Sequence, residues 1–140
     1  MCWEAAQAYP GDSRSPYLAR RFCREELGKV LADAPGRADV LDDAEVVVSE
    51  LVTNAVAAGS HAVYVALALH REWLRLTVED DAPGEPHPTR ASPRDQGGRG
   101  LRVVDALTGR WGTTVLDTGK QVWAEFPLLV GLVGNLACEL

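Results

Sequence analysis

The sequence predicts an α+β domain, a two-layer α/β sandwich in which helices cover one face of a mostly antiparallel sheet. Apolar residues recur at intervals of three and four between about residues 15 and 58, as they do in amphipathic helices. From residue 62 onward the interval changes to two, which is typical of half-buried antiparallel strands. The length of 140 residues fits a single domain over 1–140.

Two helices are predicted in the first part of the chain. The first runs from residue 15 to about residue 33; Ser15 suits the N-cap, and Pro16 suits the first helical position because an N–H is not needed there. The second runs from near residue 39 to residue 58, and Gly59 is a suitable C-terminal stop. Both helices carry an apolar stripe that needs a sheet or another helix to cover it.

Two strands follow the second helix and form a hairpin. In residues 62–69 every second residue is apolar and faces the same side. In residues 74–79 apolar and polar residues alternate strictly, which indicates one buried face and one exposed face. His70, Arg71 and Glu72 lie between the two strands and make the turn.

The remaining segments divide into a long loop, a short helix and a closing hairpin. Residues 82–100 are rich in proline and glycine, and loops of this length in compact domains are usually functional or disordered. A helix is predicted over 101–107, followed by paired strands over 110–116 and 121–126. Residues 1–14 carry few signals beyond a turn, so we predict no helix or strand there.

Composition and charge argue against several classes of protein. Lys and Arg number 14 and Asp and Glu number 20, and the net charge of −6 disfavours a general binder of nucleic acid or anionic membranes. No signal peptide is visible, and no apolar run reaches the about 18 residues that span a bilayer, so we expect a cytoplasmic protein. The three cysteines, Cys2, Cys23 and Cys138, are far apart and predict free thiols rather than a disulfide framework or a zinc site.

Glu50 and Asn54 form the first pair of residues with chemical potential. They are four residues apart and therefore share one face of the second helix. A carboxylate can deprotonate a hydroxyl nucleophile, and an amide oxygen can hold a magnesium ion that also binds phosphates. Taken alone, the pair is better explained as part of a solvated polar stripe, because this spacing is common.

Asp80 lies at the end of an apolar strand, shortly before Pro83 and Gly84. A carboxylate at a strand end can accept a hydrogen bond from an adenine amino group, and glycine allows the backbone to approach the base closely. An aspartate that simply starts a turn is the alternative, and it is the better explanation of this segment by itself.

The run Gly98, Arg99, Gly100 and Leu101 places glycines directly before a predicted helix. The free N–H groups and the dipole of a helix N-terminus favour a phosphate. No Lys-Ser or Lys-Thr pair follows and no parallel strand precedes the run, so it is neither a Walker A loop nor a Rossmann turn. A flexible hinge explains the glycines equally well.

The order of these motifs makes them specific. The chain resembles the GHKL ATPases, the superfamily that includes gyrase and the histidine kinases, and it is most similar to the small anti-sigma factor kinases of the RsbW group in their actinobacterial stand-alone form. The resemblance covers about residues 15–127 and leaves 128–140 as an apolar tail. The phrases that carry it are Ser-Glu-Leu-Val-Thr-Asn-Ala at 49–55, Gly-Arg-Gly-Leu at 98–101, Arg-Trp-Gly at 110–112 and Gly-Lys-Gln-Val-Trp-Ala at 119–124.

The resemblance implies an ATP site and the Bergerat, or histidine-kinase-like, ATPase fold. Glu50 matches the catalytic general base and Asn54 the ligand of a magnesium ion bound with the ATP phosphates. Asp80 matches the adenine-reading aspartate and Gly84 a later glycine of the same box, while residues 85–96 match the ATP lid. The positions that match the second glycine box, which covers the phosphates, are Gly98, Arg99, Gly100 and Leu101.

Two positions depart from the family pattern. Ala82 stands where the first glycine of the adenine box is usual, and no histidine follows Asn54 until His61, although one often comes sooner. The second departure bears on phosphate transfer more than on ATP binding.

The resemblance also implies a function. It indicates an anti-sigma factor and serine/threonine kinase that uses ATP and Mg²⁺ to phosphorylate a STAS-domain antagonist, with a sigma factor as its other partner. The alternatives are a switch of the same fold that binds nucleotide without catalysis and an interaction module that binds no nucleotide. The apolar tail at 128–138 fits a homodimer or a cap on the core.

Overall fold

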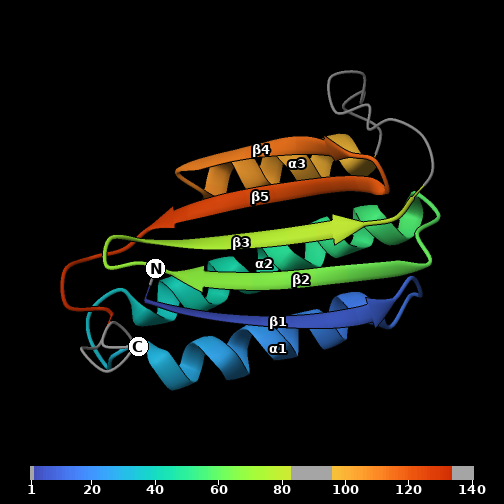
Figure 1. Cartoon of the computed structure of the whole chain (residues 1–140). Coiled ribbons are helices and arrows are strands. Elements are labelled where there is room, and N and C mark those ends of the chain that lie inside the picture. Colours follow the sequence, from blue (N-terminus) through green and yellow to red (C-terminus); the bar gives the residue numbers. More distant parts are fainter. Residues whose placement is uncertain (1, 83–95, 134–140) are drawn as a thin grey trace.

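A computed structural model describes residues 2–82 and 96–133, with only the backbone for residues 96–100. The described strands form one sheet in the order β1-β2-β3-β5-β4, in which every neighbouring pair is antiparallel. Figure 1 shows the three described helices on one face of this sheet, which confirms the predicted α+β sandwich. The elements are β1 (Trp3–Pro10), α1 (Ser15–Val30), α2 (Arg37–Ala57), β2 (Ala62–Leu69), β3 (Trp73–Asp80), α3 (Gln96–Leu107), β4 (Arg110–Leu116) and β5 (Gly119–Pro127).

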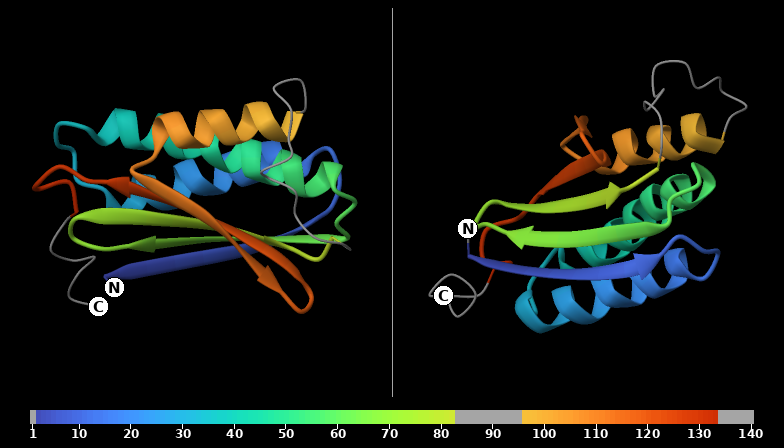
Figure 2. Two further views of the ribbon diagram at one scale, coloured as in Figure 1. Left: turned by 90° about the horizontal axis from the view of Figure 1, so that it is seen from above. Right: turned by 45° about the vertical axis from the view of Figure 1, so that its right-hand side comes forward.

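The core lies between α2 and the inner face of the sheet. Helix α2 is central, since α1 packs along one of its sides and α3 along the other (Figure 2). Each leucine or valine buried there stabilises the fold by roughly 1.5–3 kcal/mol relative to an exposed position. The buried apolar residues of α2, β2 and β3 are Leu41, Ala44, Val47, Val48, Leu51, Val52, Ala55, Val63, Val65, Leu67, Leu69, Leu74, Leu76 and Val78.

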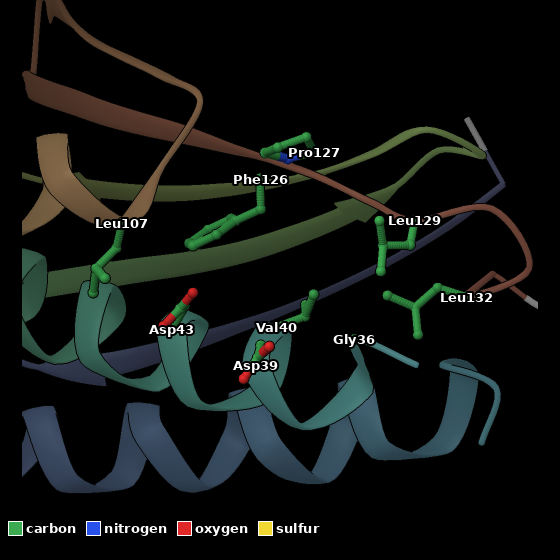
Figure 3. A pocket seen from close by; sticks show the side chains of 9 residues that line it. All are labelled: Gly36, Asp39, Val40, Asp43, Leu107, Phe126, Pro127, Leu129 and Leu132. Carbon is green, nitrogen blue, oxygen red and sulfur yellow. The ribbon is translucent and has the colours of Figure 1, made fainter. Parts of the chain in front are cut away.

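A pocket of about 210 Å³ opens where α2 begins (Figure 3). Its apolar wall includes Leu107 at the end of α3 and Phe126 near the end of β5. Asp39 and Asp43, one turn apart on α2, bring carboxylates to the same pocket. Burial, followed by the charges of Asp39 and Asp42, raises the pKa of Asp43 above its ordinary value.

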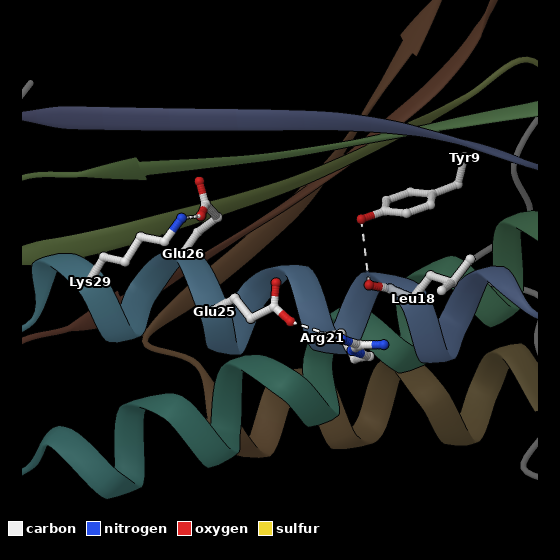
Figure 4. A network of polar contacts seen from close by, with 6 residues as sticks. All are labelled: Tyr9, Leu18, Arg21, Glu25, Glu26 and Lys29. Atoms are coloured by element: carbon white, nitrogen blue, oxygen red, sulfur yellow. Dashed lines mark hydrogen bonds and ion pairs between the residues drawn. The ribbon is translucent and has the colours of Figure 1, made fainter.

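Strand β1 was not predicted, and its sequence explains why. It contains three alanines, a glutamate and a glutamine, which are weak strand formers. It nevertheless pairs with β2 from Trp3 to Pro10, and Trp3 and Tyr9 pack against the core. The Tyr9 hydroxyl donates a 3.5 Å hydrogen bond to the Leu18 carbonyl of α1 (Figure 4), and burial is the main cause that raises the pKa of Tyr9 to about 12. Pairing and packing therefore override local propensity here.

The start of α1 differs in detail from the prediction. The N-cap is Arg14 rather than Ser15, and Pro16 lies in the first turn as expected. Ser15 is instead buried in the helix, where its hydroxyl donates to the carbonyl of Pro10 and ties α1 to the end of β1. The helix ends at Val30, earlier than predicted, because residues 31–36 are used to turn the chain into α2.

The cysteines differ from the prediction at one position. Cys23 is a free thiol buried in the core, where desolvation raises its pKa. Cys2 is disulfide-bonded, so the expectation of three free thiols is wrong. Cys138 lies outside the described residues. No helix in the described part of the chain has the length and apolar character to cross a membrane.

Candidate functional site

Three predicted motifs meet at one end of the molecule. The second half of α2 carries Glu50 and Asn54, β3 ends at Asp80, and α3 begins at Gln96. All three termini lie at the right-hand end in Figure 1, and both views in Figure 2 agree. The fold therefore gathers motifs that are well separated in the chain, as a site requires.

Asp80 is the most buried charged residue at this end, with 4% of its surface exposed. Its Oδ1 accepts a 2.9 Å hydrogen bond from the backbone N–H of Ala82, and its Oδ2 lies 2.7 Å from Nζ of Lys120. The side chain is thus held in one orientation from two sides. A carboxylate has about four lone-pair positions, so each oxygen keeps capacity for a further donor.

Lys120 is a residue that sequence reasoning did not assign to the site. The predicted strand began at residue 121, whereas β5 begins at Gly119. In the β3–β5 pair, Lys120 of β5 lies opposite Asp80 of β3. The signal was present in the alternation, because Lys120 shares the inward face of β5 with Val122, Ala124 and Phe126. A lysine in an otherwise apolar series points to a buried partner.

Gly119 makes this pairing possible. It has φ of +152°, and a Cβ placed on it would lie 1.8 Å from the carbonyl oxygen of Asp80. Only a residue without a side chain allows the backbones to approach so closely. The start of β5 is therefore pressed against the end of β3, which places Lys120 beside the carboxylate.

Glu50 and Asn54 lie on α2 as predicted and are half-buried. The buried Leu51 and Ala55 fix the rotation of the helix about its axis. Within residues 2–82 and 96–133, no hydrogen bond or ion pair engages the side chain of Glu50 or Asn54. Both side chains therefore have polar groups available to a ligand at the end where Asp80 lies.

Asp81, the acidic residue that follows Asp80, has a structural role. Its Oδ1 accepts hydrogen bonds from the backbone N–H groups of His61, at 2.8 Å, and Ala62, at 3.1 Å. These bonds lower the pKa of Asp81, and the bond from Ala62 has the largest effect. On the same connection Ser60 is buried and donates from its hydroxyl to the Ala55 carbonyl at 2.7 Å. The connection between α2 and β2 is thus fixed to the end of β3.

Helix α3 begins earlier than predicted. It starts at Gln96 instead of Leu101, so Gly98, Arg99 and Gly100 lie within its first turns rather than before it. Its N-terminus is at the end of the molecule where β3 terminates (Figure 1). Leu101 is half-buried in α3. Gly84 and residues 85–95 of the predicted lid lie outside the described residues.

The groups present fit a nucleotide with a divalent cation. Asp80 is a fixed acceptor of the type that could receive an amino group of a base, and the first turn of α3 has backbone N–H groups of the kind that bind phosphate. The side-chain oxygen of Asn54 is a ligand type that Mg²⁺ accepts, and Mg²⁺ in such sites takes few protein ligands besides phosphates and water.

Comparison with known proteins identifies the family of the domain. The sequence profile described as the histidine kinase-like ATPase domain matches residues 14–126. A solved histidine kinase domain, from the blue-light activated histidine kinase of Erythrobacter litoralis EL346, is 29% identical with a TM-score of 0.49, over 64% of this chain and 45% of that one. The chain thus spans less than half the length of that relative. No curated protein is significantly similar. Because the profile covers most of its length, the chain belongs to the histidine kinase-like ATPase domain family of the GHKL superfamily.

Proposed function

We propose that the chain is an ATP-binding regulator of the RsbW group, an anti-sigma factor and serine/threonine kinase that phosphorylates a STAS-domain antagonist in the cytoplasm. The observation that carries the nucleotide part is the buried, oriented carboxylate of Asp80 at the end where α2 presents Glu50 and Asn54. Membership of a histidine kinase-like ATPase family supports the same ligand. The sigma factor and the antagonist are the partners that the resemblance implies.

The phosphate transfer follows from the residues at this end. Glu50 would accept the proton of a serine or threonine hydroxyl on the antagonist. That oxygen would form a bond to the γ-phosphorus of ATP while the bond to the β,γ-bridging oxygen breaks, and ADP would leave. Asn54 would hold the Mg²⁺, which neutralises phosphate charge when bound. Positioning and charge neutralisation supply most of the rate in such transfers.

Calorimetric titration with ATP and Mg²⁺ tests the nucleotide part. We expect binding to the wild type and an affinity at least about tenfold lower for Asp80→Asn, because the amide puts a donor where the base needs an acceptor. Asp12→Asn is the matched control, since Asp12 is exposed and its side chain accepts a hydrogen bond from the Arg14 N–H, far from this end of β3 in the sequence. Absence of binding to the wild type would contradict the proposal and favour an interaction module that binds no nucleotide.

Transfer of labelled phosphate to a STAS-domain protein tests the kinase part. Glu50→Ala is expected to lower the transfer rate by 10²-fold or more, as loss of a general base does. Glu45→Ala is the control on the same helix, because Glu45 pairs with Arg24 on the surface of α1. Equal rates for Glu50→Ala and wild type would remove Glu50 as the base.

A switch that binds nucleotide without catalysis is the second candidate. The lack of a histidine between Asn54 and His61 favours it, because that departure bears on phosphate transfer more than on ATP binding. ATP binding without transfer to any STAS-domain protein would select this alternative.

A further inference from the structure

We propose that Lys120 reads the nucleobase together with Asp80, as a donor to ring nitrogen N1 of adenine. The inference deepens the proposed ATP site and rests on it. It assigns to β5 a direct part in base recognition and makes the specificity of the site a property of two residues on neighbouring strands.

The ammonium group of Lys120 lies next to the carboxylate of Asp80 and is largely withdrawn from solvent. Nζ of Lys120 lies 2.7 Å from Oδ2 of Asp80, and the side chains of Lys120 and Asp80 are only 17% and 3% exposed. A lysine at this level of burial is uncommon without a specific role, because its charge must leave water. The ammonium therefore lies beside the carboxylate that is assigned to the base, at the same end of the sheet.

The ammonium group of Lys120 keeps N–H donors that the pair with Asp80 does not use. A lysine ammonium has three N–H donors, and the pair with Asp80 uses one. The ammonium group of Lys120 makes no other hydrogen bond or ion pair within the described part of the chain. Donors of Lys120 thus remain available next to the acceptor lone pairs of Asp80.

The order of acceptor and donor in the Asp80–Lys120 pair matches the edge of adenine. Asp80 and Lys120 present an acceptor beside a donor, and the edge of adenine presents a donor, the 6-amino group, beside an acceptor, N1. Guanine presents the opposite order, with an acceptor at O6 and a donor at N1. Asp80 cannot exchange places with Lys120, because the Ala82 N–H holds its other oxygen and Gly119 fixes the start of β5. The fixed order favours adenine.

A purely structural ion pair between β3 and β5 is the competing explanation. The two strands already pair from Trp73 to Asp80 along β3, so their association does not depend on one side-chain contact at the end. Buried ion pairs often add little net stability over apolar residues of the same size. A pair placed at the converging motifs is therefore better explained by recognition.

A cycle of nucleotide and protein variants tests the inference by calorimetry. The ligands are ATP, 1-deaza-ATP, in which N1 is replaced by C–H, and 7-deaza-ATP as the control that keeps N1. We expect the wild type to bind 1-deaza-ATP about tenfold or more weakly than 7-deaza-ATP, the loss typical of one hydrogen bond from a charged donor. In Lys120→Met that ratio should fall to about one, although absolute affinities also fall.

The ratio separates the possible outcomes. If Lys120→Met binds every ligand more weakly but keeps the wild-type ratio, Lys120 is structural and the inference is wrong while the ATP site stands. Equal binding of the two deaza ligands by the wild type overturns the inference without any variant, which covers the case in which Lys120→Met does not fold. Failure of the wild type to bind ATP overturns the proposed function itself.

Discussion

At the C-terminal end of α2, the carboxylates at the end of the neighbouring β3 have fixed partners. At the N-terminal end of α2, the carboxylates of the helix itself lie close to one another. Asp80 is held by Lys120 and the Ala82 N–H, and Asp81 by two backbone N–H groups. Each of these bonds also restricts the backbone, so the end of β3, the start of β5 and the connection after α2 are joined. Polar groups that lack partners there, such as Glu50, stand out as candidates for ligand binding.

The N-terminal end of α2 has a different electrostatic character. Asp42 pairs with Arg24, whose side chain is 47% exposed, and such surface pairs contribute little. Asp39 and Asp43 face the pocket of Figure 3, and their mutual repulsion adds to the effect of burial on the pKa of Asp43. The two ends therefore differ in how their acids are held: those at the end of β3 have assigned donors, whereas Asp39 and Asp43 repel each other.

The largest predicted effect breaks the fixed end at Gly119. In Gly119→Ala the new Cβ would meet the Asp80 carbonyl oxygen, so β5 must move away from β3. We expect the free energy of unfolding to fall by about 2 kcal/mol or more, from backbone strain and this clash. Calorimetric ATP affinity should fall at least about tenfold, because Lys120 and Asp80 lose their register.

Gly131 offers the matched control near the opposite end. It also has a left-handed φ, of +87°, but nothing lies within 4 Å of a Cβ placed on it. Gly131→Ala should cost only about 1 kcal/mol in chemical denaturation and leave ATP affinity unchanged. If both variants lost ATP binding equally, the special role of the β3–β5 contact would be refuted.

Most of the fold was predictable because it depends on periodicity. Spacing alone predicts the strands over 62–69 and 110–116 and the helix over 39–58. The structure has these strands at the same residues and the helix at Arg37–Ala57, within two residues of the prediction. Strand β1 was missed because an alanine-rich edge strand acquires its structure from pairing with β2. Edge pairing is a tertiary interaction, and local composition does not encode it.

The candidate site was predictable only in part. Asp80 was found because it ends an apolar strand, a local pattern. Lys120 was not assigned because its meaning depends on the register between β3 and β5, which is set by the close approach at Gly119. The role of Asp81, likewise, depends on amides 19 and 20 residues away. Contacts of this kind require the strand register, which the sequence alone does not specify.

A smaller effect is expected when the connection after α2 is released from β3. Asp81→Ala removes the acceptor of the His61 and Ala62 N–H groups, so the thermal midpoint at pH 7 should fall. The folded pKa of Asp81 is lowered, so its stabilisation is present above the ordinary value of 3.8 and is lost as the pH falls through the folded pKa. The difference in midpoint between wild type and Asp81→Ala should therefore shrink at acid pH. A difference that stayed constant down to pH 2 would contradict this account.

The smallest effect concerns the repelling acids at the other end of α2. Because the pKa of Asp43 is raised, the folded state holds its proton more tightly than the unfolded chain, and stability falls as the pH rises from the ordinary value of 3.8 through the folded pKa. Asp43→Asn removes this loss and should raise the free energy of unfolding at pH 7 by a few tenths of a kcal/mol, a small gain because the side chain keeps part of its surface in solvent, which screens the charge. Denaturation curves of Asp43→Asn and wild type should converge below about pH 3.8.

Asp42→Asn is the control, because it also removes one negative charge but breaks the pair with Arg24, and it should give no gain. Equal gains from both variants would mean that net charge, rather than the position of Asp43 at the pocket, sets the effect, and the contrast between the two ends of α2 would then not extend to stability.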